Sequence, residues 1–166
     1  IEVLVPIHIK QAVITALKSA HPYEEVAYEL LEIINANQQL GAGMIGELET
    51  AISEKDFLEF CKTALKTACI RHTELLGNEV KKVAFCGGSG SFLLPNAISA
   101  KADVFITGDF KYHDFFDADG KILIADVGHF ESEQFTIELL ADYLMEKFPT
   151  FAVLKTGVNT NPIAYV

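Results

Sequence analysis

Apolar residues recur at two different periods in the first 34 residues. Residues 2–6 form a short apolar run that ends at a proline, which predicts a strand. From Ile9 onward, apolar residues recur at intervals of three and four, which predicts a helix over residues 8–20. Alternating apolar and polar positions then predict a second strand over residues 26–34. This strand–helix–strand segment is too small to be stable alone, so we expect it to pack on another part of the protein.

A polar, glycine-rich stretch over residues 35–46 is the clearest boundary in the chain. We therefore expect two domains, residues 1–36 and residues 37–166. Beyond the boundary, Ser53 is followed three positions later by Asp56, a capping pattern that predicts the start of a helix. Strands and helices alternate after it: we expect strands near 68–76, 82–86, 104–107, 122–125 and 151–155, and helices near 92–100 and 132–147.

Several of these expected strands are continuous apolar runs, which is typical of strands that are buried on both faces. Strands that alternate with helices indicate an α/β fold, here a mixed-sheet α/β sandwich. The helix expected over residues 132–147 carries an apolar stripe that should point inward. Its members are Phe135, Leu139, Leu140 and Tyr143.

Composition narrows the class of protein. Half of the 166 residues are hydrophobic and 22% are charged, which excludes a disordered chain. No apolar run approaches the roughly 18 residues of a membrane-spanning helix, so we expect no membrane association. The net charge is −10 and the 13 basic residues are scattered, which argues against nucleic-acid binding. Three cysteines without a CxxC spacing indicate reduced thiols, as in a cytoplasmic protein, with Cys61 and Cys86 in apolar surroundings.

Two strand ends carry the candidate chemistry. Asp109 and His113 follow one buried strand and a glycine, and His129 and Glu133 follow another. Each carboxylate and imidazole are four residues apart, so on a helix each pair would share one face and could bind one metal ion or substrate. Ligands of open α/β sheets bind at the carboxyl ends of strands. The alternative is that Asp109 and Ser132 cap helices while the histidines bond to the backbone.

A glycine-rich turn follows the expected strand at 82–86. Its residues Gly87, Gly88, Ser89 and Gly90 lie between that strand and a helix, so their N–H groups could bind a phosphate or another anion. The dinucleotide spacing GxGxxG is absent, since its sixth position is Leu93. The alternative is a tight turn that needs glycine dihedral angles.

Short carboxylates gather in the second half of the chain. Six aspartates lie between residues 103 and 126, a concentration that suits a divalent cation. Three of them, Asp114, Asp117 and Asp119, fit turn and capping positions on a solvated loop equally well.

These motifs together carry a family resemblance. The glycine turn, the run from residue 102 to residue 113 and the sequence GHFESE at residues 128–133 resemble the NGG-interacting-factor-three-like family. Its members are often labelled as a second type of GTP cyclohydrolase I. The similarity continues to Asn161 and Pro162. Residues 21–28 are similar to the end of a ferredoxin-like module, of the CutA/PII type, that many bacterial members carry inserted in their chain.

The resemblance implies an α/β fold with two divalent metal ions at the centre of a homo-oligomeric ring, commonly a hexamer. Its His-x-x-x-Glu pair of metal ligands falls on His129 and Glu133, and Asp109 and His113 match a motif near that site. The metal could be zinc, manganese, iron or nickel, because imidazole and carboxylate accept all four. The family's adjacent histidines have no counterpart here, so the chain resembles the later part of such a protein, preceded by a β-α-β fragment of the inserted module.

Two functions are compatible with the resemblance. The first is a hydrolase-like enzyme in which metal-activated water attacks a small-molecule substrate, and the family label would make that reaction the opening of the purine ring of GTP. The alternative is a non-enzymatic metal-binding regulatory or scaffold oligomer. A weaker third reading is a phosphate-binding protein that uses the turn from Gly87 to Gly90. Since even catalytic zinc keeps three protein ligands, we expect this chain alone to bind metal weakly and to be inactive.

Overall fold

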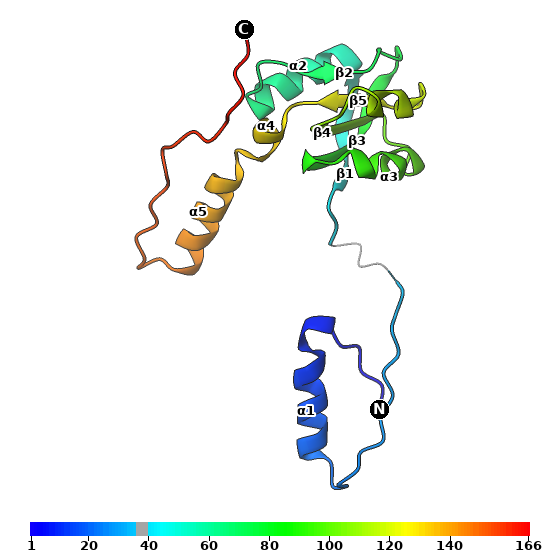
Figure 1. The fold of residues 1–166 in the computed structure, drawn as a ribbon, viewed down its shortest axis with the longest axis vertical. Coiled ribbons are helices and arrows are strands. Elements are labelled where there is room, and N and C mark those ends of the chain that lie inside the picture. The colour runs from blue at the N-terminus through cyan, green and yellow to red at the C-terminus, as the bar shows by residue number, and fades with distance from the viewer. Residues whose placement is uncertain (36–39) are drawn as a thin grey trace. The chain divides into compact units, whose positions relative to one another are not determined.

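The computed structural model describes residues 1–35 and 40–166. The chain divides into two compact units, Ile1–Asn37 and Gln38–Val166, which are coloured from blue to cyan and from cyan to red in Figure 1. The expected domain boundary, between residues 36 and 37, lies outside the described residues. Among the described residues, no helix combines the length and the apolar character needed to cross a membrane.

The first unit is built around one helix. A 3-10 turn, η1 (Ile7–Ile9), leads into α1 (Lys10–Ala20), which confirms the expected helix. The helix stops at His21, whose Nδ1 accepts a hydrogen bond of 3.1 Å from the N–H of Tyr23. The strands expected at residues 2–6 and 26–34 are wrong: the described residues there are extended but join no sheet. A strand needs a hydrogen-bonded neighbour, and apolar alternation alone does not supply one.

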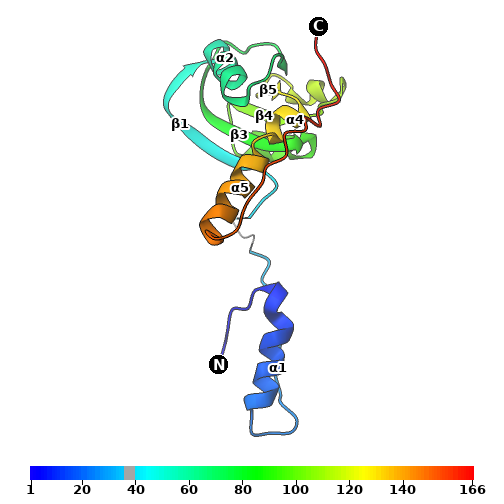
Figure 2. The ribbon, with the colours of Figure 1, turned by 90° about the vertical axis from the view of Figure 1, so that its left-hand side faces the viewer.

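The second unit contains a five-stranded mixed sheet, which confirms the expected fold class. Its strands lie in the order β1 (Met44–Ser53), β3 (Glu79–Ser89), β4 (Val104–Gly108), β5 (Leu123–Asp126) and β2 (Arg71–His72). The central strands β3, β4 and β5 run parallel, and the two edge strands pair antiparallel to their neighbours. Figure 2 shows β1 and β3 as long, curved neighbours beneath the helix α2.

Helices and turns follow the strands in the chain. They are α2 (Glu54–Leu65), η2 (Ser91–Leu93), α3 (Leu94–Ser99), η3 (Asp114–Ala118), α4 (His129–Glu133) and α5 (Thr136–Lys147). Helix α2 begins as the sequence predicts, because the Ser53 hydroxyl accepts a hydrogen bond from the N–H of Asp56. Phe57 and Cys61 of this helix are buried, and burial raises the pKa of the Cys61 thiol to about 12.

The core lies on both faces of the sheet, as the continuous apolar strands predict. Phe105 and Ile124 pack on one face with residues of α3 and η3. Val104 and Leu123, their neighbours in sequence, pack on the other face against α2. All three cysteines are free, and both Cys61 and Cys86 are buried, which confirms their expected place in the core.

Several elements differ from the expectations. Strand β1 begins inside the stretch 35–46 that the sequence indicates as a boundary, and residues 44–46 are its first three positions. There, Gly43 has no room for a side chain, since a Cβ atom would lie 2.8 Å from the carbonyl oxygen of Phe85 in β3. The strand expected at 68–76 is reduced to Arg71–His72, and the one at 151–155 is absent from the described residues.

The helix expected over residues 132–147 is two helices, α4 and α5. The apolar stripe of α5 does not point inward: Leu139 is 69% exposed, Leu140 55% and Tyr143 56%. Only Ala141 of this helix is buried. The 3.6-residue period shows which face of a helix is apolar, but the described part of this chain offers that face no partner.

Candidate functional site

The candidate site lies where the three parallel strands end. Strand β3 ends in the glycine turn, β4 is followed by Asp109, and β5 is followed by Gly128 and α4. Because Thr107 pairs with Asp126 in the parallel register, the residues two positions further on, Asp109 and Gly128, leave the sheet side by side. The approach is close: a Cβ atom on Gly108 would lie 2.8 Å from the backbone nitrogen of His129.

His129 lies between two carboxylates. Its Nδ1 is 2.6 Å from Oδ2 of Asp109, and its Nε2 is 3.3 Å from Oε2 of Glu133 one turn further along α4. All three side chains are about half exposed. The hydrogen bond with Asp109 is the main cause that raises the pKa of His129, and the charges of Asp109 and Glu133 add to it. The four-residue spacing of His129 and Glu133 therefore corresponds to an observed contact between their side chains.

The glycine turn lies directly against the side chains of His129 and Glu133. A Cβ atom on Gly88 would lie 2.5 Å from Oε1 of Glu133 and 3.2 Å from Cε1 of His129. The N–H of Gly88 donates to the hydroxyl of Ser132, which donates in turn to the carbonyl of His129. The carbonyl of Gly88 accepts from the hydroxyl of Thr107. These bonds fix α4 against the end of β3.

The same contacts bear on the predicted anion site. One N–H of the turn is already bonded to Ser132, and the carboxylate of Glu133 lies against Gly88. A bound anion would meet that negative charge at close range. Anion binding by residues 87–90 stays a prediction, and both contacts count against it.

His113 does not join this cluster. Residues 109–113 are not helical, and Asp109 itself has a left-handed φ of +58°, so the four-residue spacing does not place the two side chains together. The ring of His113 lies against Tyr112 instead, with 5.1 Å between ring centres. Within residues 1–35 and 40–166, no hydrogen bond or ion pair links His113 to Asp109 or to His129.

Two residues that the sequence did not single out hold the strand ends together. Asp126 is buried and pairs with Arg71, which comes from the edge strand β2. The carboxylate also accepts hydrogen bonds from the N–H of Phe110 at 3.0 Å and of Gly128 at 3.1 Å. Arg71 donates in addition to the carbonyl of Phe110. The signal that could have found Asp126 is its place directly after an apolar strand, where a charged residue is buried only with partners.

A second buried acid fastens the C-terminal segment. Glu131 of α4 is 6% exposed, and its Oε1 accepts a hydrogen bond of 3.2 Å from the side-chain amide of Asn161. Its other oxygen, Oε2, has no partner among the described residues. A Cβ atom on Gly128 would lie 2.2 Å from that oxygen and 3.5 Å from the hydroxyl of Tyr165. Burial, together with the charge of Glu131, raises the pKa of Tyr165.

The chemistry of this donor set fits a divalent metal in part. Nε2 of His129 and Oε2 of Glu133 lie 3.3 Å apart, and Asp109 contacts the other nitrogen of the ring. In the described part of the chain, no group of three or more His, Cys, Asp or Glu side chains could hold a metal ion. A complete site would therefore need ligands beyond this pair.

Comparisons with known proteins agree on one family. The sequence model described as Duf34/NIF3 (NGG1p interacting factor 3) matches residues 7–162. The chain is 34% identical over 171 aligned positions to a protein of Halalkalibacterium halodurans named GTP cyclohydrolase 1 type 2 homolog, covering 100% of this chain and 46% of that protein. It is 32% identical over 154 residues to a Staphylococcus epidermidis protein of the same name, covering 90% and 42%. The chain thus spans about half the length of these relatives.

Solved structures give the same result for the fold. Staphylococcus aureus protein SA1388 superposes with a TM-score of 0.80 at 27% identity, covering 100% of this chain and 55% of that one. A Bacillus cereus protein related to NIF3 superposes with a TM-score of 0.74 at 32% identity, covering 98% and 46%. Both likenesses extend over both units of the chain.

Proposed function

The chain belongs to the Duf34/NIF3 family, and from that premise we propose that His129 and Glu133 bind one divalent metal ion and that Asp109 orients the imidazole. In a protein of the relatives' full length, this pair would be one part of a two-metal, hydrolase-like site in which the ions lower the pKa of a bound water molecule. The remaining ligands would come from residues outside this chain. The substrate would be a small molecule.

The separation of the two ligand atoms carries this proposal. Two atoms bound tetrahedrally to one zinc ion at bond lengths of about 2.0–2.2 Å lie about 3.3–3.6 Å apart. Nε2 of His129 and Oε2 of Glu133 are 3.3 Å apart. Helix α4 sets this distance, because residues four apart on a helix lie on one face.

Asp109 has a positioning role in the proposal. A carboxylate accepts a hydrogen bond from Nδ1–H of His129, which leaves the lone pair of the neutral ring on Nε2, beside Glu133. The same bond raises the pKa of His129, so a proton competes with the metal for Nε2 more strongly than in a free imidazole. Metal affinity should therefore rise with pH.

The test is a titration of the 166-residue chain with Zn²⁺ by calorimetry and with Mn²⁺ by NMR line broadening. We expect weak binding, with a dissociation constant above micromolar, and line broadening centred on the resonances of His129 and Glu133. His129→Asn and Glu133→Gln should abolish it, whereas His113→Asn, the matched control, should not change it. Sub-micromolar affinity, or broadening that survives His129→Asn, would contradict the proposal.

A second candidate is the metal-binding scaffold, and the exposed apolar stripe of α5 favours it. Leu139, Leu140 and Tyr143 present to solvent the kind of surface that protein partners or further copies of the same chain cover. Under this candidate the protein is a homo-oligomer, and its assembly does not depend on the metal pair. The test is to measure the molar masses of the wild type and of Glu133→Gln by light scattering. Equal masses above that of a monomer support a scaffold, and a monomeric mass for both proteins refutes it.

A further inference from the structure

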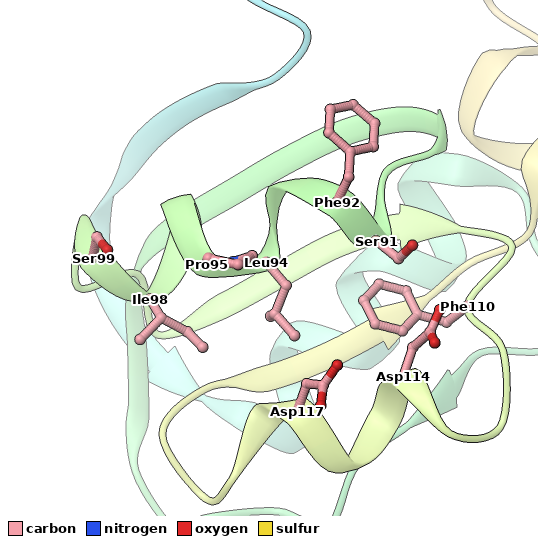
Figure 3. A pocket seen from close by; sticks show the side chains of 9 residues that line it. All are labelled: Ser91, Phe92, Leu94, Pro95, Ile98, Ser99, Phe110, Asp114 and Asp117. Carbon is pink, nitrogen blue, oxygen red and sulfur yellow. The ribbon is translucent and has the colours of Figure 1, made fainter.

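A groove of about 510 Å³ opens between the segment formed by η2 and α3 and the segment formed by η3 (Figure 3). This volume is within the range of small-molecule sites. Leu94 and Phe110 form its buried floor, with 3% and 2% of their surfaces exposed. Pro95 and Ile98 add apolar lining, whereas the ring of Phe92, which is 64% exposed, projects away from Asp114 and Asp117 in Figure 3.

The polar lining of the groove has one sign of charge. Asp114 and Asp117 supply two carboxylates, Ser91 and Ser99 supply hydroxyls, and the described residues that line the groove include no basic side chain. Positions three apart in a 3-10 helix lie on the same side, and Figure 3 shows both carboxylates projecting from η3 toward the side of Leu94. Within the described residues, neither carboxylate accepts a hydrogen bond or forms an ion pair. Their acceptor capacity is available to a ligand.

We propose that this groove binds a flat ligand that presents adjacent N–H donors, as an amidinium, a guanidinium or an amino-substituted heterocycle does. A carboxylate accepts two parallel N–H bonds from such an edge, and this pairing selects for planar donors. The apolar lining of the groove contacts a face of the ring. The two carboxylates repel anionic groups, so any anionic part of the ligand must lie outside the groove.

The groove is connected to the candidate site through the chain itself. Ser91 follows Gly90 of the glycine turn, and Phe110 follows Asp109, the partner of His129. Consecutive Cα atoms are about 3.8 Å apart, so the backbone that lines the groove continues directly into the backbone of the candidate site. If the proposed metal pair is correct, the groove holds the non-reacting ring of the substrate and sets its class. This last step rests on the proposed function, whereas binding in the groove does not.

The test uses NMR chemical-shift titrations of the 166-residue chain at pH 7. No metal is added, so the result does not depend on whether His129 and Glu133 bind a metal ion. The probe is benzamidine, and the matched neutral control is benzyl alcohol. We expect benzamidine to shift the resonances of Phe92, Ile98 and η3 and to bind at least tenfold more tightly than benzyl alcohol. Equal affinities, or shifts centred elsewhere, would overturn the proposal.

The double variant Asp114→Asn/Asp117→Asn should weaken benzamidine binding at least tenfold. The control is the double variant Asp119→Asn/Asp142→Asn, which removes the same number of negative charges. Asp119 follows η3 and Asp142 lies in α5, and neither residue lines the groove. An equal loss in both double variants would show general charge attraction and refute specific pairing.

Two further probes test which kind of molecule supplies the adjacent N–H donors. Guanosine differs from inosine by the 2-amino group alone, and an arginine amide carries the guanidinium. Tighter binding of guanosine than of inosine would assign the groove to a nucleobase, and tighter binding of the arginine amide would assign it to a guanidinium side chain. If neither binds more tightly than inosine, the proposal fails.

Discussion

Gly88 allows the sharpest test of how the backbone holds the candidate site. This residue has a φ of +65°, and a Cβ atom on it would lie 2.5 Å from Oε1 of Glu133. The variant Gly88→Ala therefore introduces two effects at once. One is the strain of a left-handed alanine, and the other is a collision with a proposed ligand.

The two effects differ in size and in consequence. A left-handed conformation costs a residue with a Cβ atom about 1–2 kcal/mol, which changes the unfolding equilibrium by about 5–30-fold. To restore ordinary contact, the carboxylate of Glu133 must retreat by about 0.9 Å. The retreat costs little stability, because Glu133 is flexible and its side chain is 50% exposed. It exceeds the roughly 0.5 Å within which a ligand must be held, so metal affinity should fall at least about tenfold.

Gly120→Ala is the matched control. Gly120 has a φ of +64°, and a Cβ atom there would meet nothing within 4 Å. Urea unfolding followed by far-ultraviolet circular dichroism should give the same loss of stability for both variants. Titration with Mn²⁺ should separate them, since only Gly88→Ala moves Glu133.

Two results would refute this reasoning. If both variants bind Mn²⁺ as the wild type does, the contact with Gly88 does not set the position of Glu133. If Gly88→Ala loses several kcal/mol more stability than Gly120→Ala, the carboxylate cannot retreat, and the site is rigid rather than adjustable.

Three further perturbations test the surroundings of the site. Asp109→Asn, which keeps a residue that tolerates the φ of +58°, should lower the pKa of His129 in an NMR titration, because the hydrogen bond with Asp109 is the main cause that raises it. The stability that this pair adds is present below the ordinary histidine pKa of about 6.5 and is lost as pH rises through the raised value. It should amount to less than about 1 kcal/mol in urea unfolding because both groups are half exposed, and Asp109→Asn should remove it. Arg71→Met should cost about 1.5–3 kcal/mol in the same assay, because it leaves the buried Asp126 carboxylate with backbone donors alone; an unchanged midpoint would show that the pair is not needed. The Cys61 thiol, whose pKa burial raises to about 12, should resist a thiol reagent at pH 8 until urea unfolds the chain, and rapid labelling of the folded protein would contradict its burial.

The fold was predictable where burial on both faces fixes the pattern. Strands β4 and β5 are continuous apolar runs with charged or glycine residues at their ends, and they stand where the sequence predicts. Strand β1 was not predictable in the same way. It lies at the edge of the sheet, most of its positions are exposed, and its first three residues fall in the polar, glycine-rich stretch 35–46. Pairing with β3 makes it a strand, and a pairing of distant segments has no local signature.

The site shows the same division between local and distant information. The contact between His129 and Glu133 follows from helical spacing, which a sequence displays directly. The contact between His129 and Asp109 spans 20 positions and depends on the parallel register of β4 and β5. Spacing alone paired Asp109 with His113 instead, because it assumed a helix that the left-handed backbone at Asp109 prevents.

Left-handed residues mark the end of each strand that contributes to the site. Gly88 lies at the end of β3 with a φ of +65°, Asp109 follows β4 with +58°, and Gly128 follows β5 with +95°. Left-handed residues elsewhere, such as Lys66 and Asp119, close helices, where this conformation is ordinary. At the three strand ends these segments lie close together, because a Cβ atom on Gly88 would lie 3.2 Å from Cε1 of His129, and Nδ1 of that ring is 2.6 Å from Oδ2 of Asp109. Glycine adopts a positive φ freely, so only Asp109 is strained here, and strain of this kind concentrates at functional sites. The position of the His129 imidazole therefore depends on the backbone at these three strand ends as well as on its two carboxylate partners. Replacing Gly88 or Gly128 by alanine should displace the imidazole although no polar side chain is removed.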